Sequence, residues 1–203
     1  MKWLSNLNDK LNLLRGSIFF VRKHFITIFG LGLIAAFGRV IQLGGFGEIP
    51  SWANLALEAV VETARVLIFL FVLGLANIKR GAYQVGRLFT GRSNLKTYWS
   101  IATKKLKGQW IQISLSFLGF LIVAGLINLL IDSLAYETCL YLTLKREGIL
   151  AETTSEWTIL LFFKNISVIP FTIVFETILL LWVTRDFNLT PSGRLTAKNI
   201  ESV

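Results

Sequence analysis

Residues 55–77, LALEAVVETARVLIFLFVLGLAN, are long and apolar enough to cross a lipid bilayer as one helix, yet they include Glu58, Glu62 and Arg65. At about 100° per residue, steps of four and three bring these charges onto one helical face. A charge that faces lipid at mid-depth is energetically unfavourable, so this face is expected to look toward protein or trapped water. The stretch therefore predicts a membrane protein in which other helices supply partners for this face.

The composition indicates a small polytopic membrane protein. Of the 203 residues, 54% are hydrophobic and only 16% are charged, far from the usage of a soluble domain. Four apolar blocks each approach the roughly 20 residues that span a bilayer: 25–44, 55–77, 111–131 and 158–183. We therefore expect an all-α fold in which residues 1–203 form a single four-span membrane domain.

Charge asymmetry between the connecting segments predicts the topology. Residues 1–24 hold five Lys or Arg against one acid, and residues 132–156 hold five acids against two bases. Residues 78–109 hold eight bases and no acid: Lys79, Arg80, Arg87, Arg92, Lys96, Lys104, Lys105 and Lys107. Because Lys and Arg concentrate in short cytoplasmic segments, we expect a cytoplasmic 78–109 loop, an outer 132–156 loop and cytoplasmic termini, including a 184–203 tail.

Apolar residues at helical spacing predict helices outside the spans. Within residues 1–20 they are Trp3, Leu4, Leu7, Leu11 and Leu14, and in the basic loop they are Leu95, Tyr98, Trp99, Ala102 and Leu106. The first helix could lie on the membrane surface or pack on a partner subunit. The basic loop could bind the anionic inner leaflet or an acidic partner, or it could only set the topology. We expect a cytoplasmic protein partner and no direct binding of nucleic acid.

The predicted spans contain six charges in all. Arg39, Lys164 and Glu176 join the three charges of residues 55–77, giving three bases against three acids. An estimate of depth along the helices puts Arg39 and Glu62 at a similar level, so we predict them as the first pair. The six charges could form a path for ions or substrates, or a sensor whose pairs exchange. Alternatively, they are ion pairs that fix the helix register.

Local signals refine the first and fourth spans. Gly32 and Ala36 lie four residues apart, a spacing of small residues that allows close approach of another helix. Pro170 is expected to kink the fourth span near residues 166–170, because proline removes a helical hydrogen bond. Thr154 or Ser155 is expected to cap the start of that span.

The remaining residues offer little for catalysis. The chain has one cysteine, Cys139, and one histidine, His24, so we expect no disulfide and no structural zinc site. His24 lies beside Arg22 and Lys23 at the start of the first span, which favours an interfacial position. No hydrolase or metalloprotease motif occurs. We therefore expect no catalytic residue, no metal and no cofactor.

The size, the four spans, the inward termini and the large basic cytoplasmic face resemble the membrane component of the Kiwa two-component anti-phage system. The resemblance is one of layout over the whole chain. It implies a bacterial inner-membrane protein that oligomerises and works with a cytoplasmic partner, which binds DNA in that family.

Three hypotheses for function follow. The first is a non-enzymatic, oligomeric membrane scaffold or sensor that recruits or regulates a cytoplasmic partner through its basic face. The second is a small channel or transporter that uses the charged face of residues 55–77. The third is an accessory subunit of a larger membrane complex.

Overall fold

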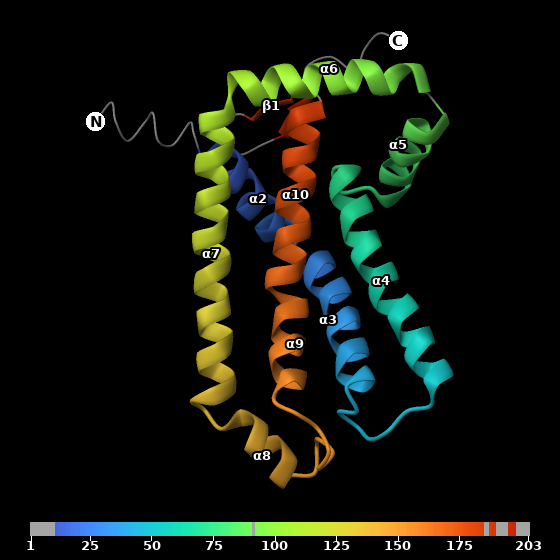
Figure 1. Cartoon of the computed structure of the whole chain (residues 1–203), viewed down its shortest axis with the longest axis vertical. Helices are drawn as coiled ribbons and strands as arrows, with labels where there is room; N and C mark the ends of the chain where they lie inside the picture. Colours follow the sequence, from blue (N-terminus) through green and yellow to red (C-terminus); the bar gives the residue numbers. More distant parts are fainter. Residues whose placement is uncertain (1–10, 91, 185–186, 190–194, 198–203) are drawn as a thin grey trace, which may run out of the picture. The chain divides into compact units, whose positions relative to one another are not determined.

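The computed structural model of the chain describes residues 11–90, 92–184, 187–189 and 195–197; the side chains of 87–90, 92–98, 101 and the two strands are not part of that description. The described residues form helices and one short hairpin (Figure 1). The elements are α2 (Asn12–Lys23), α3 (Phe25–Gln42), α4 (Ser51–Leu73), α5 (Ile78–Thr90), α6 (Arg92–Gly108), α7 (Trp110–Tyr136), α8 (Leu140–Arg146), α9 (Trp157–Ile166), α10 (Val168–Thr184), β1 (Phe187–Leu189) and β2 (Leu195–Ala197).

Several of these helices are long and apolar enough to cross a membrane. Within the described residues three spans meet that requirement by length and composition: α3, α7, and α9 taken together with α10. A fourth candidate combines α4 with the beginning of α5, across a bend of 89°. The expectation of a helical membrane protein is confirmed, with three or four candidate spans at the predicted apolar blocks.

The second predicted span ends earlier than expected. Residues 55–77 were expected to form one helix, but α4 begins at Ser51 and ends at Leu73. Leu75 and Ala76 have φ angles of 55° and 73°, and this left-handed backbone cannot continue a right-handed helix. The Asn77 Oδ1 atom then accepts a hydrogen bond of 3.1 Å from the backbone N–H of Arg80, which caps the start of α5. The observed helix has the predicted length, 23 residues, but lies four residues earlier in the chain, because hydrophobicity alone does not locate this turn.

The chain divides into two compact units. One contains Met1–His24, Phe69–Ile122 and Ile173–Val203, and the other contains Phe25–Ile68 and Val123–Thr172. We refer to them as the first and second unit and describe each by itself.

The second unit is built around the contact between α3 and α9, which lie side by side in Figure 1. At Gly32 an added Cβ would lie 3.0 Å from the backbone oxygen of Asn165, so the two backbones approach closely. Ala36 is fully buried. This is the close approach that the spacing of small residues predicted. A buried cluster extends the core: Val40, Ile131, Ala135, Leu150, Ile159 and Leu160.

The fourth predicted span is broken as expected. The helix is interrupted at Ser167, whose φ and ψ of −125° and −78° separate α9 from α10. Pro170 lies in the first turn of α10, where proline is tolerated because the first N–H groups of a helix have no partner within it.

The predicted cap of this span is wrong. Glu156 occupies the N-cap position of α9, and no side-chain capping bond forms there. The Thr154 hydroxyl instead donates a 3.1 Å hydrogen bond to the backbone oxygen of Gly44, and the Ala151 N–H donates to the Gly45 oxygen at 2.9 Å. These bonds join the α3–α4 connection to the segment before α9. The Thr154 side chain therefore connects two segments of the chain and does not cap a helix.

In the first unit, the predicted N-terminal helix is described only from residue 11, so Trp3, Leu4 and Leu7 lie outside the described residues. Helix α2 buries Leu13, Leu14 and Phe20 against protein rather than presenting them to lipid. The unit also holds a hairpin in which β1 pairs with β2 in antiparallel register, with Asn188 opposite Thr196.

Candidate functional site: the charged face of α4

The second unit brings Arg39 of α3 to the charged face of α4. Arg39 Nη1 lies 2.6 Å from Glu58 Oε2, and Arg39 Nη2 lies 3.0 Å from Glu58 Oε1. A paired fork of this kind is stronger and more directional than a single ion pair. Arg39 Nη2 also lies 3.4 Å from Glu62 Oε1, a longer contact.

The principal partner of Arg39 is thus Glu58, and the prediction that Arg39 pairs first with Glu62 is corrected. The reason is local, because Arg65 lies one turn along α4 from Glu62. Arg65 Nη1 donates to Glu62 Oε1 at 2.6 Å and takes up that oxygen. Depth estimated from residue counts could not resolve two acids one turn apart.

Two amides complete the end of the cluster that lies next to the α3–α4 connection. Gln42 Oε1 accepts from Arg39 at 2.9 Å, and Gln42 Nε2 donates to Glu58 Oε2 at 3.0 Å. Gln42 Nε2 also lies 3.0 Å from both the backbone oxygen and Oδ1 of Asn54. The sequence reasoning missed Gln42 and Asn54. Their positions three residues after Arg39 and four before Glu58 were the available signal, since such spacings share a helical face.

Asn165 connects the opposite end of the cluster to α9. Arg65 Nη2 donates to Asn165 Oδ1 at 2.9 Å, and Asn165 Nδ2 donates to the Leu161 oxygen at 2.8 Å. Asn165 is buried, while Arg65 Nε is buried without a partner among the described residues. Arg65 therefore links α4 to α9 through one nitrogen and to Glu62 through another.

The side chains of the two acids in the cluster are more exposed than those of the two bases. The side chains of Arg39 and Arg65 are 23% and 24% exposed, whereas those of Glu58 and Glu62 are 43% and 49% exposed. The arginines are thus enclosed by α3, α4 and α9, and the carboxylates lie at an uncovered surface of the unit. We call this surface the carboxylate face.

The other two predicted intramembrane charges do not join the cluster. Lys164 of α9 is half-buried and forms no ion pair or hydrogen bond with any residue that the structure describes. Glu176 belongs to α10 in the first unit, is exposed, and likewise has no ion pair within the described chain. The cluster therefore balances two bases against two acids rather than three against three.

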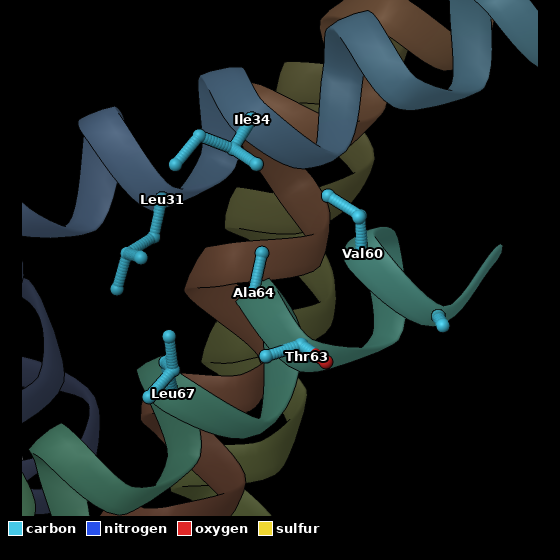
Figure 2. Close-up of a pocket in the computed structure, with 7 residues that line it drawn as sticks. Leu31, Ile34, Val60, Thr63, Ala64 and Leu67 are labelled. Atoms are coloured by element: carbon cyan, nitrogen blue, oxygen red, sulfur yellow. The ribbon is translucent and has the colours of Figure 1, made fainter. Parts of the chain in front are cut away.

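The other side of α4 forms an apolar groove with α3 (Figure 2). Thr63 and Leu67 lie more than 90° around the helix from Glu62, so the groove and the carboxylate face point in different directions. The groove has a volume of about 260 Å³ and is lined by Leu31, Ile34, Ala59, Val60, Thr63, Ala64 and Leu67. Its lining is apolar except for Thr63.

The basic loop forms α5 and α6 in the first unit. Four of its predicted contact residues are exposed: Lys79, Arg80, Lys104 and Lys107. Lys105 instead donates to the backbone oxygen of Trp182 at 3.0 Å and lies 5.5 Å from the centre of its ring. The side chains of Arg87, Arg92 and Lys96 lie outside the described residues. We call the four exposed cations the basic face.

The predicted apolar stripe of α6 is described only in part. Trp99 and Leu106 are exposed and Ala102 is buried, whereas the side chains of Leu95 and Tyr98 lie outside the described residues. Exposed Trp and Leu beside lysines are typical of helices at a membrane surface.

The chemistry of these sites is that of ion pairing. Within the described residues no three His, Cys, Asp or Glu side chains gather in a way that could hold a metal ion. Comparison of the chain with protein-family models, curated proteins and solved structures finds no match in any of the three.

Proposed function

We propose that the protein is a non-enzymatic membrane assembly protein. Copies of the chain associate through the carboxylate face, and the assembly presents the basic face of α5 and α6 to a cytoplasmic partner. The observation that carries this proposal is the exposure of the Glu58 and Glu62 side chains, 43% and 49%, within a candidate membrane span.

The physical argument concerns what covers those carboxylates. Charged groups in membrane helices face other helices or water, because lipid cannot solvate them. Arg39 and Arg65 neutralise the two acids but leave nearly half of each carboxylate side chain uncovered. Association of copies in the membrane would cover this face with polar groups. The protein surface itself therefore supports self-association.

The mass of the protein in nanodiscs tests the assembly. We expect a defined oligomer for the wild type and a shift toward monomer for the double variant Glu58→Gln/Glu62→Gln, which lacks the carboxylates that association is proposed to cover. The matched control is Glu147→Gln, because Glu147 lies with Arg146 in an exposed pair at the end of α8. A monomeric wild type would refute the proposal.

The proposed orientation places both termini and the basic face in the cytoplasm, with bacterial inner membrane as the setting that the Kiwa-like layout suggests. The single cysteine, Cys139, is exposed between α7 and α8 and tests this directly. A maleimide that does not cross membranes should label Cys139 in intact cells. In a Cys139→Ser/Lys107→Cys variant it should label only after permeabilisation, and the reverse pattern would invert the topology.

The partner of the basic face is proposed to be an acidic cytoplasmic protein. Replacing Lys79, Arg80, Lys104 and Lys107 together by Gln should abolish its co-purification without changing the oligomer mass, because these side chains are exposed. Retention of the partner by this variant would exclude the basic face. The Kiwa-like layout makes phage infection the process to challenge first, with plating efficiency as the readout.

A channel remains the second candidate, and one observation bears on it. Both acids of the cluster are paired with arginine within the unit. This pairing supports a role in holding helices together more than a role as a path for ions. Ion or proton flux in liposomes, changed by Glu62→Gln, would favour conduction instead.

A further inference from the structure

We infer that in the assembly Glu62 of one copy pairs with Lys164 of the neighbouring copy. This inference rests on the proposed function, since it requires that copies associate. It assigns a specific contact to the carboxylate face and a role to a lysine that has no partner in its own copy.

The Glu62 carboxylate has an unused acceptor. Both of its contacts, with Arg65 at 2.6 Å and with Arg39 at 3.4 Å, use Oε1. Oε2 accepts no hydrogen bond from any residue that the structure describes, although the side chain is 49% exposed. An oxyanion at this position attracts a further cation.

Lys164 is the matching unpaired donor. It lies within the candidate span formed by α9 and α10, two turns from the start of α9, half-buried and without an ion pair or hydrogen bond to the described residues. An unpartnered ammonium inside a membrane is unfavourable, so a partner from outside the copy is expected. The flexible four-carbon stem of lysine can carry the charge across an interface.

The two groups lie at the same depth. Arg65 contacts Glu62 at 2.6 Å and Asn165 at 2.9 Å, and Lys164 is the chain neighbour of Asn165. Glu62 and Lys164 are therefore at one level of the second unit. Copies related by a symmetry axis along the membrane normal keep every residue at its own depth, so only groups at a common level can meet between them.

The ion pairs within one copy leave Lys164 over. Arg39 and Arg65 take up Glu58 and Glu62, whereas neither Lys164 nor Asp132 of α7 forms an ion pair with the described residues of the second unit. A contact between copies gives Lys164 the open oxygen of Glu62. The same pairing is available to a two-fold dimer and to a closed ring, because each copy offers one Glu62 and one Lys164.

Disulfide trapping in the membrane tests the contact. In a Cys139→Ser background, one tagged chain carries Glu62→Cys and a second, differently tagged chain carries Lys164→Cys, and the two are expressed together. We expect oxidation to give a mixed cross-linked dimer. We expect no cross-link for Glu62→Cys expressed alone, nor for Glu62→Cys expressed with Leu130→Cys, an exposed position of α7.

A second measurement does not depend on cysteines. Lys164→Met keeps the length of the side chain but removes the charge, and we expect it to weaken association by about thirtyfold or more, as loss of one partner of a covered charge pair does. Lys164→Arg should retain the oligomer. Lys107→Met, on the exposed basic face, is the matched control for loss of a lysine.

The outcomes separate the two proposals. A monomeric wild type would overturn both the assembly and this contact. A wild-type oligomer that persists in Lys164→Met, and whose Glu62→Cys and Lys164→Cys chains do not cross-link, would overturn only the contact. A self-cross-link of Glu62→Cys would also overturn it, because that result places two acids face to face.

Discussion

Arg39 donates to both oxygens of Glu58, at 2.6 Å and 3.0 Å, and so joins the end of α3 to α4 in the second unit. The guanidinium fork fixes the relative rotation of the two helices more firmly than a single contact could. Gln42, three residues along α3, bonds to both members of the pair. The pair is therefore a specific joint between two helices rather than a loose charge balance.

We predict that Arg39 is coupled more strongly to Glu58 than to Glu62. Double-mutant cycles with alanine, read as the shift in thermal unfolding midpoint in detergent, should give a larger coupling for Arg39/Glu58, which is bidentate, than for Arg39/Glu62, whose contact is 3.4 Å long. Likewise, the exchange Arg39→Glu/Glu58→Arg should recover more protein than Arg39→Glu/Glu62→Arg. Equal couplings in the two cycles would contradict the assignment.

Gly32 provides a test of the α3–α9 contact. A side chain at this position would meet the backbone of Asn165 at 3.0 Å and Cα of Ile166 at 3.3 Å, and backbone cannot move aside easily. We expect Gly32→Val to lower the free energy of unfolding by about 1–3 kcal/mol, in the range of other overpacking substitutions.

The control for that test lies half a turn away on the same helix. Gly30 has no atom within 4 Å of the position of an added Cβ, so Gly30→Val makes the same chemical change without a clash. Titration with SDS in mixed micelles, followed by helical circular dichroism, compares the two variants. The close approach of α3 and α9 is refuted if both lose the same stability.

The spans could be read from the sequence because hydrophobic length alone determines them. The position of the α9–α10 break followed in the same way from Pro170, since proline acts locally. The end of α4 was missed, because Leu75 and Ala76 carry no signal for left-handed backbone and the apolar block was read through to residue 77, although Gly74 and Asn77 are residues that often lie at helix ends.

The charged cluster was predictable as a set but not in its pairing. Helical spacing placed Glu58, Glu62 and Arg65 on one face, and this follows from the geometry of the helix. The pairing of Arg39 depends on Arg65, which occupies Glu62, and on Gln42, which bonds to both Arg39 and Glu58. Helical spacing alone does not show these contacts. The isolation of Lys164 has the same origin, because a balanced count of the six charges in the predicted spans does not show which of them meet.

The turn between α4 and α5 yields a third prediction. Asn77→Ala removes the acceptor for the Arg80 N–H and should lower the free energy of unfolding by about 1 kcal/mol, the usual effect of losing an N-cap. Asn77→Asp or Asn77→Ser, which can also accept this bond, should retain most of the stability. Equal losses for Ala and Ser would show that the side-chain cap is unimportant.

Gly81 tests the fit of α5 within the first unit. A Cβ at Gly81 would lie 2.0 Å from the backbone oxygen of Leu70, whereas a Cβ at Gly86, also in α5, would meet nothing within 4 Å. We expect Gly81→Ala to destabilise the protein and to weaken binding of the cytoplasmic partner, since α5 carries part of the basic face. Gly86→Ala should leave stability and partner binding unchanged. Thermal unfolding and co-purification compare the two variants directly.

The last prediction concerns pH. His24 follows α2 and lies outside the candidate spans. The centre of its ring lies 4.7 Å from the ring centre of Phe20 and 5.4 Å from that of Phe71. Burial lowers the pKa of His24 from its ordinary value of 6.5, and the positive charge of Lys23 lowers it further. The folded protein therefore binds this proton less readily than the unfolded chain does.

Because the pKa of His24 is lower in the folded state, stability is highest above the ordinary value of 6.5 and falls as the pH drops through it. The decrease ends once the pH lies below the folded-state pKa. We expect the thermal unfolding midpoint of the wild type to fall between about pH 8 and pH 5.5, a window in which carboxylates stay largely ionised. His24→Gln, which cannot take up the proton, should show a flatter profile over the same window. A thermal unfolding midpoint that rises on acidification would contradict this prediction, because it would mean that the fold stabilises the charged form of His24.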